Sequence, residues 1–248
     1  MVQIIGRMGT LVKHMFCEPI VNGGNSLGTV PITETEESIP GNVARRSPSQ
    51  ARSTARKEAI LDATRRLLAR GELDSITTKR IAKEAKVPVG SVYYLYPDKF
   101  AIYQEILSNS FDSIWDQLTS GDTTEHPDWK VSVAQGLDVA VKFYATDIAF
   151  ANLYGALRFL PQLQKIDIEM NVRLQALYAE RLQVWLPAVS KARAEAVAIT
   201  VNSIGDRLLQ EYLYATNKKQ RKLIVEEMKR AVIAYLEACV TAVGRQNV

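Results

Sequence analysis

The chain has 248 residues, of which 47% are hydrophobic and 23% are charged, a balance typical of a globular protein with a buried core. It contains no run of about 18 apolar residues, the length that a membrane-spanning helix requires. Its first residues also lack the continuous apolar segment of a secretory signal. We therefore expect a cytoplasmic protein that does not associate with membranes. Two cysteines are too few for a disulfide framework or a metal cluster, so neither a metal nor a cofactor is expected.

Positive charge is concentrated in about a quarter of the chain. Residues 45–101 contain thirteen basic and six acidic residues, a net charge of +7, whereas the segments before and after them carry −2 and −1. A basic segment beside nearly neutral ones is the distribution expected of a module that binds a polyanion such as nucleic acid. A solvated basic surface without a partner is the alternative that charge alone leaves open.

Glycine and proline interrupt residues 1–48 repeatedly, and no helical or alternating periodicity appears there. This composition predicts a disordered extension. Helical periodicity begins after it, and the alternating pattern of β-strands never accumulates, so the predicted fold class is all-α. The first helix is expected to begin at Ser53 or Thr54, either of which could cap it, and to end before Gly71.

Two short helices joined by a tight turn are predicted next. The first begins at Thr77 or Thr78, residues 86–88 interrupt it, and Pro97 ends the second. Two such helices within a basic segment form a helix-turn-helix, which we place at about residues 76–95. A fourth, longer helix follows to about residue 119, and its length of roughly 30 Å would connect two domains.

The second helix of such a motif lies in the major groove of double-stranded DNA, with its N-terminal residues at the base edges. Val89, Gly90 and Ser91 are small and would allow the helix backbone to approach the bases. Hydroxyl groups and cations nearby would bind phosphates and fix the register. The residues placed to do so are Thr78, Lys79, Tyr93, Tyr94 and Lys99.

These residues resemble the signature of the TetR family of transcriptional regulators in order and spacing. The resemblance covers residues 54–114 and implies DNA contacts at the eight positions just named, from Thr78 to Lys99. It also implies a helical C-terminal domain that binds a ligand and forms a dimer. The matching positions are Thr77, Thr78, Ile81, Ala82, Ala85, Val87, Gly90, Ser91, Val92, Tyr93, Tyr94 and Lys99.

Two residues depart from the family pattern. Lys86 stands where the family usually has a glycine, and a left-handed conformation would cost a lysine about 1 kcal/mol. Pro88 stands where a capping serine is usual, so the first N–H groups of the second helix lack a side-chain acceptor, which a phosphate could replace. The departures concern the detailed base contacts more than the motif itself.

About nine helices in three regions are expected in all. Residues 1–48 form the disordered extension, residues 49–114 the DNA-binding domain, and residues 115–248 a helical effector-binding and dimerisation domain. The C-terminal helices are expected at about residues 127–145, 147–160, 163–185, 191–216 and 219–243, with proline marking two of the ends.

The last two predicted helices are apolar on more than one face, so each needs two partners. One partner is their own domain, and the other is the same helix pair of a second subunit, which predicts a homodimer. Packing of both faces within one subunit is the alternative. The middle helices carry polar and aromatic groups that could line a ligand cavity, and the expected effector contacts are Tyr144, Asn152, Tyr154, Arg158, Asn171 and Tyr178.

The expected function is sequence-specific regulation of transcription, as a repressor that binds a palindromic operator as a dimer and is released by a small-molecule effector through the long fourth helix. Repression and activation both stay open, because the position of the operator decides between them. An alternative regulator lacks a small ligand and responds to a protein partner or acts constitutively. An enclosed apolar cavity of about 300 Å³ or more would distinguish the two. No phosphate loop, nucleophile elbow or paired-carboxylate motif is present, so an enzyme is not expected.

Overall fold

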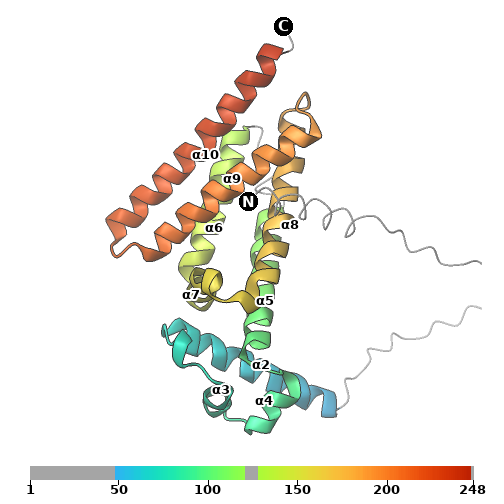
Figure 1. Ribbon diagram of the computed structural model, residues 1–248, viewed down its shortest axis with the longest axis vertical. Helices are drawn as coiled ribbons and strands as arrows, with labels where there is room; N and C mark the ends of the chain where they lie inside the picture. The colour runs from blue at the N-terminus through green and yellow to red at the C-terminus, as the bar shows by residue number, and fades with distance from the viewer. Residues whose placement is uncertain (1–47, 121–127, 247–248) are drawn as a thin grey trace, which may run out of the picture. The chain divides into compact units, whose positions relative to one another are not determined.

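The computed structural model describes residues 48–120 and 128–246 (Figure 1). Nine α-helices and three short 3-10 helices form the regular structure of these two ranges, which contain no β-strand. The predicted all-α fold class is confirmed. The predicted disordered extension lies outside the described residues, apart from its last residue. No helix within the two ranges combines the length and the apolar composition that a membrane crossing requires.

The first described helix, α2, spans Pro48–Ala69 and begins earlier than the sequence predicts. Proline fits the first turn of a helix because its missing N–H would have no intrahelical partner there. Thr54 lies inside the helix, where its hydroxyl donates a hydrogen bond of 3.0 Å to the carbonyl of Gln50. The helix ends before Gly71, whose φ of +74° is a left-handed conformation that glycine adopts without strain.

Two short helices pack on α2 after the 3-10 helix η1 (Leu73–Ser75). They are α3 (Thr78–Ala85) and α4 (Val89–Leu95), and we refer to α2, α3 and α4 together as the head. Burial of a leucine or isoleucine side chain stabilises a fold by roughly 1.5–3 kcal/mol. The fully buried apolar side chains that the three helices and the adjoining Ile76 bring together are Ile60, Leu67, Leu68, Ile76, Ile81 and Val92.

The long helix α5 spans Lys99–Thr119 and leads from the head into the C-terminal helices (Figure 1). Asp98 caps it, accepting a hydrogen bond of 3.0 Å from the backbone N–H of Ala101. Its buried face belongs to the same apolar cluster as the core of the head. That face carries Tyr103, Leu107, Phe111, Ile114 and Leu118.

Five further α-helices complete the described chain. Each lies close to its predicted position, but the helix expected over residues 147–160 is shorter, because the first of two 3-10 helices replaces its end. The second of these begins at Pro161, a position where a missing N–H does no harm. The elements are α6 (Trp129–Thr146), α7 (Ile148–Ala156), η3 (Leu157–Phe159), η4 (Pro161–Leu163), α8 (Gln164–Trp185), α9 (Lys191–Tyr214) and α10 (Lys218–Gln246).

The C-terminal helices pack in two apolar clusters. One continues from the head through α5 into α6, α7 and the first half of α8. The other joins the second half of α8 to α9 and α10, so that α9 packs against both neighbouring helices (Figure 1). The rings of Trp129 and Trp185, whose centroids are 6.3 Å apart, connect the start of α6 to the end of α8.

Candidate functional site

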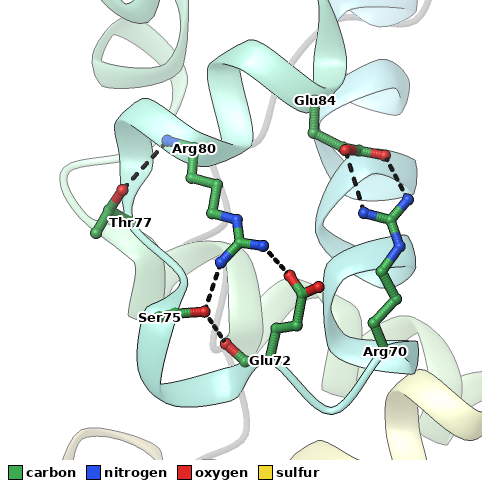
Figure 2. Close-up of polar contacts among 6 residues, drawn as sticks. All are labelled: Arg70, Glu72, Ser75, Thr77, Arg80 and Glu84. Atoms are coloured by element: carbon green, nitrogen blue, oxygen red, sulfur yellow. Dashed lines mark hydrogen bonds and ion pairs between the residues drawn. The ribbon is translucent and has the colours of Figure 1, made fainter.

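Two groups of ion pairs hold α3 in the head (Figure 2). Glu84 of α3 accepts a hydrogen bond of 3.1 Å from Arg66 of α2 and one of 3.2 Å from Arg70, the residue that follows α2. Figure 2 shows the contact with Arg70. These bonds hold the pKa of the Glu84 carboxyl below its ordinary value. At the start of α3, Arg80 pairs with Glu72. Because solvent-exposed pairs add little stability, their main effect is to fix the direction of α3 against α2.

Ion pairs within the protein therefore neutralise part of the positive charge of residues 45–101. Carboxylates pair with Lys57 and with four arginines, Arg65, Arg66, Arg70 and Arg80. Within the described ranges, the other cations of this segment pair with no carboxylate. Those around α3 and the following turn are exposed and available to a polyanion: Lys79, Lys83 and Lys86.

The turn between α3 and α4 has the left-handed conformation that the family pattern requires. Lys86 adopts a φ of 57° and a ψ of 38°, at a cost of about 1 kcal/mol for a lysine. The turn is closed by a hydrogen bond of 3.0 Å from the N–H of Val87 to the carbonyl of Ala82. The departure from glycine therefore strains the turn without opening it.

One face of α4 is buried and the opposite face is open to solvent. Val92 is fully buried against α2 and α3, whereas Val89, Tyr93 and Tyr94 are exposed, the last by 82%. Pro88 precedes the helix and supplies no side-chain hydrogen bond to its first N–H groups, as its chemistry predicts. The exposed valine and the two exposed tyrosines of this short helix do not contribute to the core of the protein.

The glycine in the first turn of α4 is not required by the packing of the protein. A Cβ atom added to Gly90 would meet nothing within 4 Å, and its backbone is helical. Glycine in a helix is less favourable than alanine by about 1 kcal/mol. The missing side chain therefore leaves room for something outside the protein, such as the edge of a base pair.

The predicted phosphate-binding residues differ in how they are held. The hydroxyl groups of Thr78 and Tyr93 share a hydrogen bond of 2.8 Å that ties α3 to α4. Tyr94 and Lys79 extend into solvent. Lys99 instead turns toward the head, donating a hydrogen bond of 3.0 Å to the carbonyl of Ile76 beside the ring of Phe100. A phosphate contact by this lysine would use its two remaining N–H groups.

A second candidate site is a partly enclosed cavity of about 110 Å³ between α5, α6, α7, α8, α9 and α10. Its lining is mostly apolar, with small residues on α6 at Gly136 and Ala140. Four of the six predicted effector residues line it: Tyr144, Tyr154, Asn171 and Tyr178. Burial raises the pKa of all three tyrosines, so their hydroxyl groups stay protonated.

The other two predicted effector residues, Asn152 and Arg158, do not line the cavity. The side-chain amide of Asn152 donates a hydrogen bond of 2.8 Å to the carbonyl of Leu68, one of the last carbonyls of α2. Arg158 is exposed in η3 and donates to the side chain of Gln210. Both predictions assumed that the polar residues of α7 and η3 all face one cavity. Instead, one face of this segment lines the cavity, another contacts α2, and a third is exposed to solvent.

Sequence reasoning missed four polar residues of the cavity. Asn202 donates a hydrogen bond of 2.7 Å to Asn171, and Asp206 accepts one from Tyr154. Ser132 and Arg181 also line the cavity. On α9, Asn202, Gly205 and Asp206 interrupt an apolar stripe at helical spacing. This interruption is the sequence signal that could have placed α9 against a cavity.

The helix α7 connects the cavity to the head. Its residues Phe150 and Tyr154 line the cavity. At its start, Asp147 forms an ion pair of 3.0 Å with Arg65 of α2 and accepts a hydrogen bond of 2.9 Å from Ser110 of α5. A change in the cavity that moves α7 would therefore act directly on α2.

Two family models match the chain. The first, described as bacterial regulatory proteins of the tetR family, matches residues 60–106, and the second, described as a tetracyclin repressor-like C-terminal domain, matches residues 128–236. Together they match more than half of the chain. The protein therefore belongs to the TetR family, whose members are DNA-binding transcriptional regulators. The resemblance that the helix-turn-helix residues suggested is confirmed.

Solved structures share the fold. A transcriptional regulator from Cytophaga hutchinsonii is 13% identical with a TM-score of 0.58, covering 73% of this chain and 96% of that one. A TetR-family regulator from Streptomyces coelicolor is 24% identical with a TM-score of 0.50, covering 74% and 98%. The multidrug binding protein EbrR, complexed with imidazole, is 18% identical with a TM-score of 0.54, covering 71% and 93%. No curated protein matches the chain.

Proposed function

We propose that the protein binds a palindromic DNA operator as a homodimer, represses transcription there, and is released when a small-molecule effector occupies the cavity. The observation that carries the DNA-binding part is the exposed face of α4, beside cations that no carboxylate within the described ranges neutralises. The proposed DNA contacts are Thr78, Lys79, Val89, Gly90, Ser91, Tyr93, Tyr94 and Lys99.

In this arrangement α4 enters the major groove with Gly90 at its tip. The open space around that glycine supports a close approach of the helix backbone to a base pair. The hydroxyl groups of Tyr93 and Tyr94 and the ammonium of Lys79 would then bind the flanking phosphates. The ion pairs between α2 and α3 would hold both helices at a constant angle to the groove.

The proposed dimer forms through α9 and α10. Their inner faces pack within the protomer, where Val197 of α9 and Val232 of α10 belong to one apolar cluster. Their outer faces keep apolar residues in solvent, including Ile199 on α9 and Leu223 on α10. A second copy of the same helix pair would cover these residues and place two heads on one palindrome.

The cavity, about 110 Å³ and partly open, is smaller than the enclosed cavity of about 300 Å³ that would decide for a small ligand, so the composition of its lining is what supports an effector. The cavity is lined mainly by apolar side chains with a few polar groups, which is the composition of small-molecule sites. EbrR, which shares the fold, is a multidrug binding protein that was complexed with imidazole. We propose that occupancy shifts α5 and α7, which line the cavity and both contact Arg65 of α2.

Selection of bound sequences from random duplex DNA with the full chain tests the proposal. We expect enrichment of one inverted repeat, with half-sites about one helical turn or a multiple of it apart. The variant Tyr94→Ala removes an exposed side chain of α4 and should abolish the enrichment, whereas Ile168→Ala, an exposed change on α8, should leave it intact. A folded wild-type chain that enriches no sequence in dilute salt contradicts the proposal.

A further inference from the structure

One end of the cavity contains hydrogen-bond donors without acceptors. Ser132 of α6 is only 2% exposed, and its hydroxyl has no hydrogen-bond partner within the described ranges. The same is true of the Nε–H of Arg181 on α8, which is also shielded from solvent. Both residues line the cavity. Donors that are buried without acceptors are rare in folded proteins, and a ligand that supplies the acceptor explains them.

The two donors lie at the same end of the cavity. Trp129, one turn before Ser132 on α6, has its ring 6.3 Å from the ring of Trp185, one turn after Arg181 on α8. The guanidinium of Arg181 also donates a hydrogen bond to the carbonyl of Leu118, at the end of α5. Three helix ends therefore bring these donors together.

The polar groups at the opposite end already have partners. Asp206 accepts hydrogen bonds from the hydroxyl of Tyr154 and, at 3.1 Å, from the amide of Gln210. Tyr144, beside Tyr154, follows Ser132 by twelve residues on α6, which separates the two ends by about 18 Å at 1.5 Å per residue. The middle of the cavity is apolar and is lined on α6 by the small residues Gly136 and Ala140.

The charge of Arg181 is also uncompensated. Within the described ranges, no carboxylate lies within ion-pair distance of its guanidinium, and burial lowers its pKa. A partly buried cation without a counter-ion is unfavourable, and an anionic ligand would relieve the cost. A carboxylate suits an arginine particularly well because its oxygens match the planar array of guanidinium N–H groups.

We propose that the effector is an anionic amphiphile, a molecule with a carboxylate head at Arg181 and Ser132 and an apolar body along the middle of the cavity. The proposal rests on the regulatory function proposed above and adds the chemical class of its ligand. In the complex, the Nε–H of Arg181 and the hydroxyl of Ser132 donate to the carboxylate oxygens. The apolar body replaces water beside Leu137 and Ala140 of α6.

Titration of the full chain with three probes of equal chain length tests this assignment, following the fluorescence of Trp185 and the other tryptophans. The probes are octanoate, octan-1-ol and octylammonium. We expect octanoate to bind more tightly than octan-1-ol by about tenfold or more, the effect of a charged hydrogen bond. The variant Arg181→Gln should remove this preference while keeping octan-1-ol binding, and Ser132→Ala should reduce it. Arg173→Gln, on the exposed side of α8, is the matched control and should retain it.

Several results would overturn the assignment. They are equal binding of octanoate and octan-1-ol, tighter binding of octylammonium, no binding of octanoate, or a preference for octanoate that survives Arg181→Gln. The wild-type comparison is decisive even where a variant fails to fold, which circular dichroism would reveal. DNA binding is measured separately on the same samples without any probe. A failure of the proposed regulatory function is therefore distinguishable from a failure of the ligand assignment.

Discussion

Two residues of the helix-turn-helix have conformational preferences that oppose the structure they occupy. Gly90 weakens α4 without being needed for packing, and Lys86 adopts a left-handed backbone that favours glycine. Natural sequences tolerate such conflicts mainly where function requires them. The glycine fits that explanation, because the space beside it faces outward. Nothing in the structure explains the lysine beyond its exposed positive charge at the edge of the proposed DNA surface.

Replacement of Gly90 by alanine should separate folding from DNA binding. The added methyl group meets no atom of the protein and improves helix propensity, so the free energy of unfolding should rise by about 0.5–1 kcal/mol. The same methyl group should lower affinity for a selected operator by about tenfold, comparable to the loss of one base contact. Urea unfolding and fluorescence anisotropy measure the two quantities. An operator affinity that does not fall would remove α4 from the interface.

Replacement of Lys86 by glycine should relieve strain in the turn. Because its φ is 57°, the substitution should raise the free energy of unfolding by up to about 1 kcal/mol. Lys83→Gly, also at an exposed lysine but in the helix α3, should lower it by about 1 kcal/mol and serves as the control. Two variants that are equally destabilised in urea would show that the turn is not strained.

At the scale of the helices, α7 is the element that joins the two candidate sites. It lines the cavity with aromatic side chains, and its first turn is bound to α2 through Asp147 and Arg65. Both side chains of this pair are less than one third exposed, and the hydroxyl oxygen of Ser110 of α5 accepts a hydrogen bond of 3.2 Å from the same arginine. Partial burial and shared partners make such a pair stronger than an isolated surface pair.

A double-mutant cycle should show this difference. Arg65→Ala and Asp147→Asn remove the two charges, while asparagine can still cap α7. The coupling energy from urea unfolding should be about 1 kcal/mol, against less than about 0.5 kcal/mol for the same cycle on the more exposed pair of Arg173 and Asp112. Equal coupling energies in the two cycles would mean that α7 is not specially connected to the head.

The sequence predicts elements better than it predicts which way their faces point. Helix caps and breaks are local, so Asp98 and Pro97 could be placed from residue chemistry, whereas the left-handed turn at Lys86 was expected from the family pattern. The side of α7 on which Asn152 lies depends on how α2 packs, a long-range contact that no local pattern records. Arg181 was missed for the same reason, because its partial burial results from three helices meeting around it. The predicted domain boundaries and DNA contacts stay predictions.

At the scale of the whole molecule, DNA recognition requires two heads at a defined spacing. One head presents a single short helix and a few cations, which is enough to contact one half-site of a palindromic operator. The apolar side chains left in solvent on α9 and α10 offer a way to join two protomers. Dimerisation would therefore control operator affinity as strongly as the contacts of α4 do.

A charge on the proposed dimer surface should dissociate the protein. Ile199→Glu places a carboxylate where α9 would meet its copy, and sedimentation at micromolar concentration should change from dimer to monomer. Operator affinity should then fall by a factor of about 100 or more, because each head would bind alone. The control Ile168→Glu alters an equally exposed isoleucine on α8 and should stay dimeric. A wild-type chain that sediments only as monomer contradicts this part of the account.

Sequence-specific binding by a dimer is tested by comparing the affinity of the full chain for a selected inverted repeat and for a scrambled duplex of the same length and composition. We expect two chains per selected duplex and an affinity at least about 1,000-fold above that for the scrambled duplex at physiological salt. Both affinities should fall steeply as salt rises, because phosphate contacts release counter-ions. Equal affinity of the folded chain for the two duplexes would contradict sequence-specific binding.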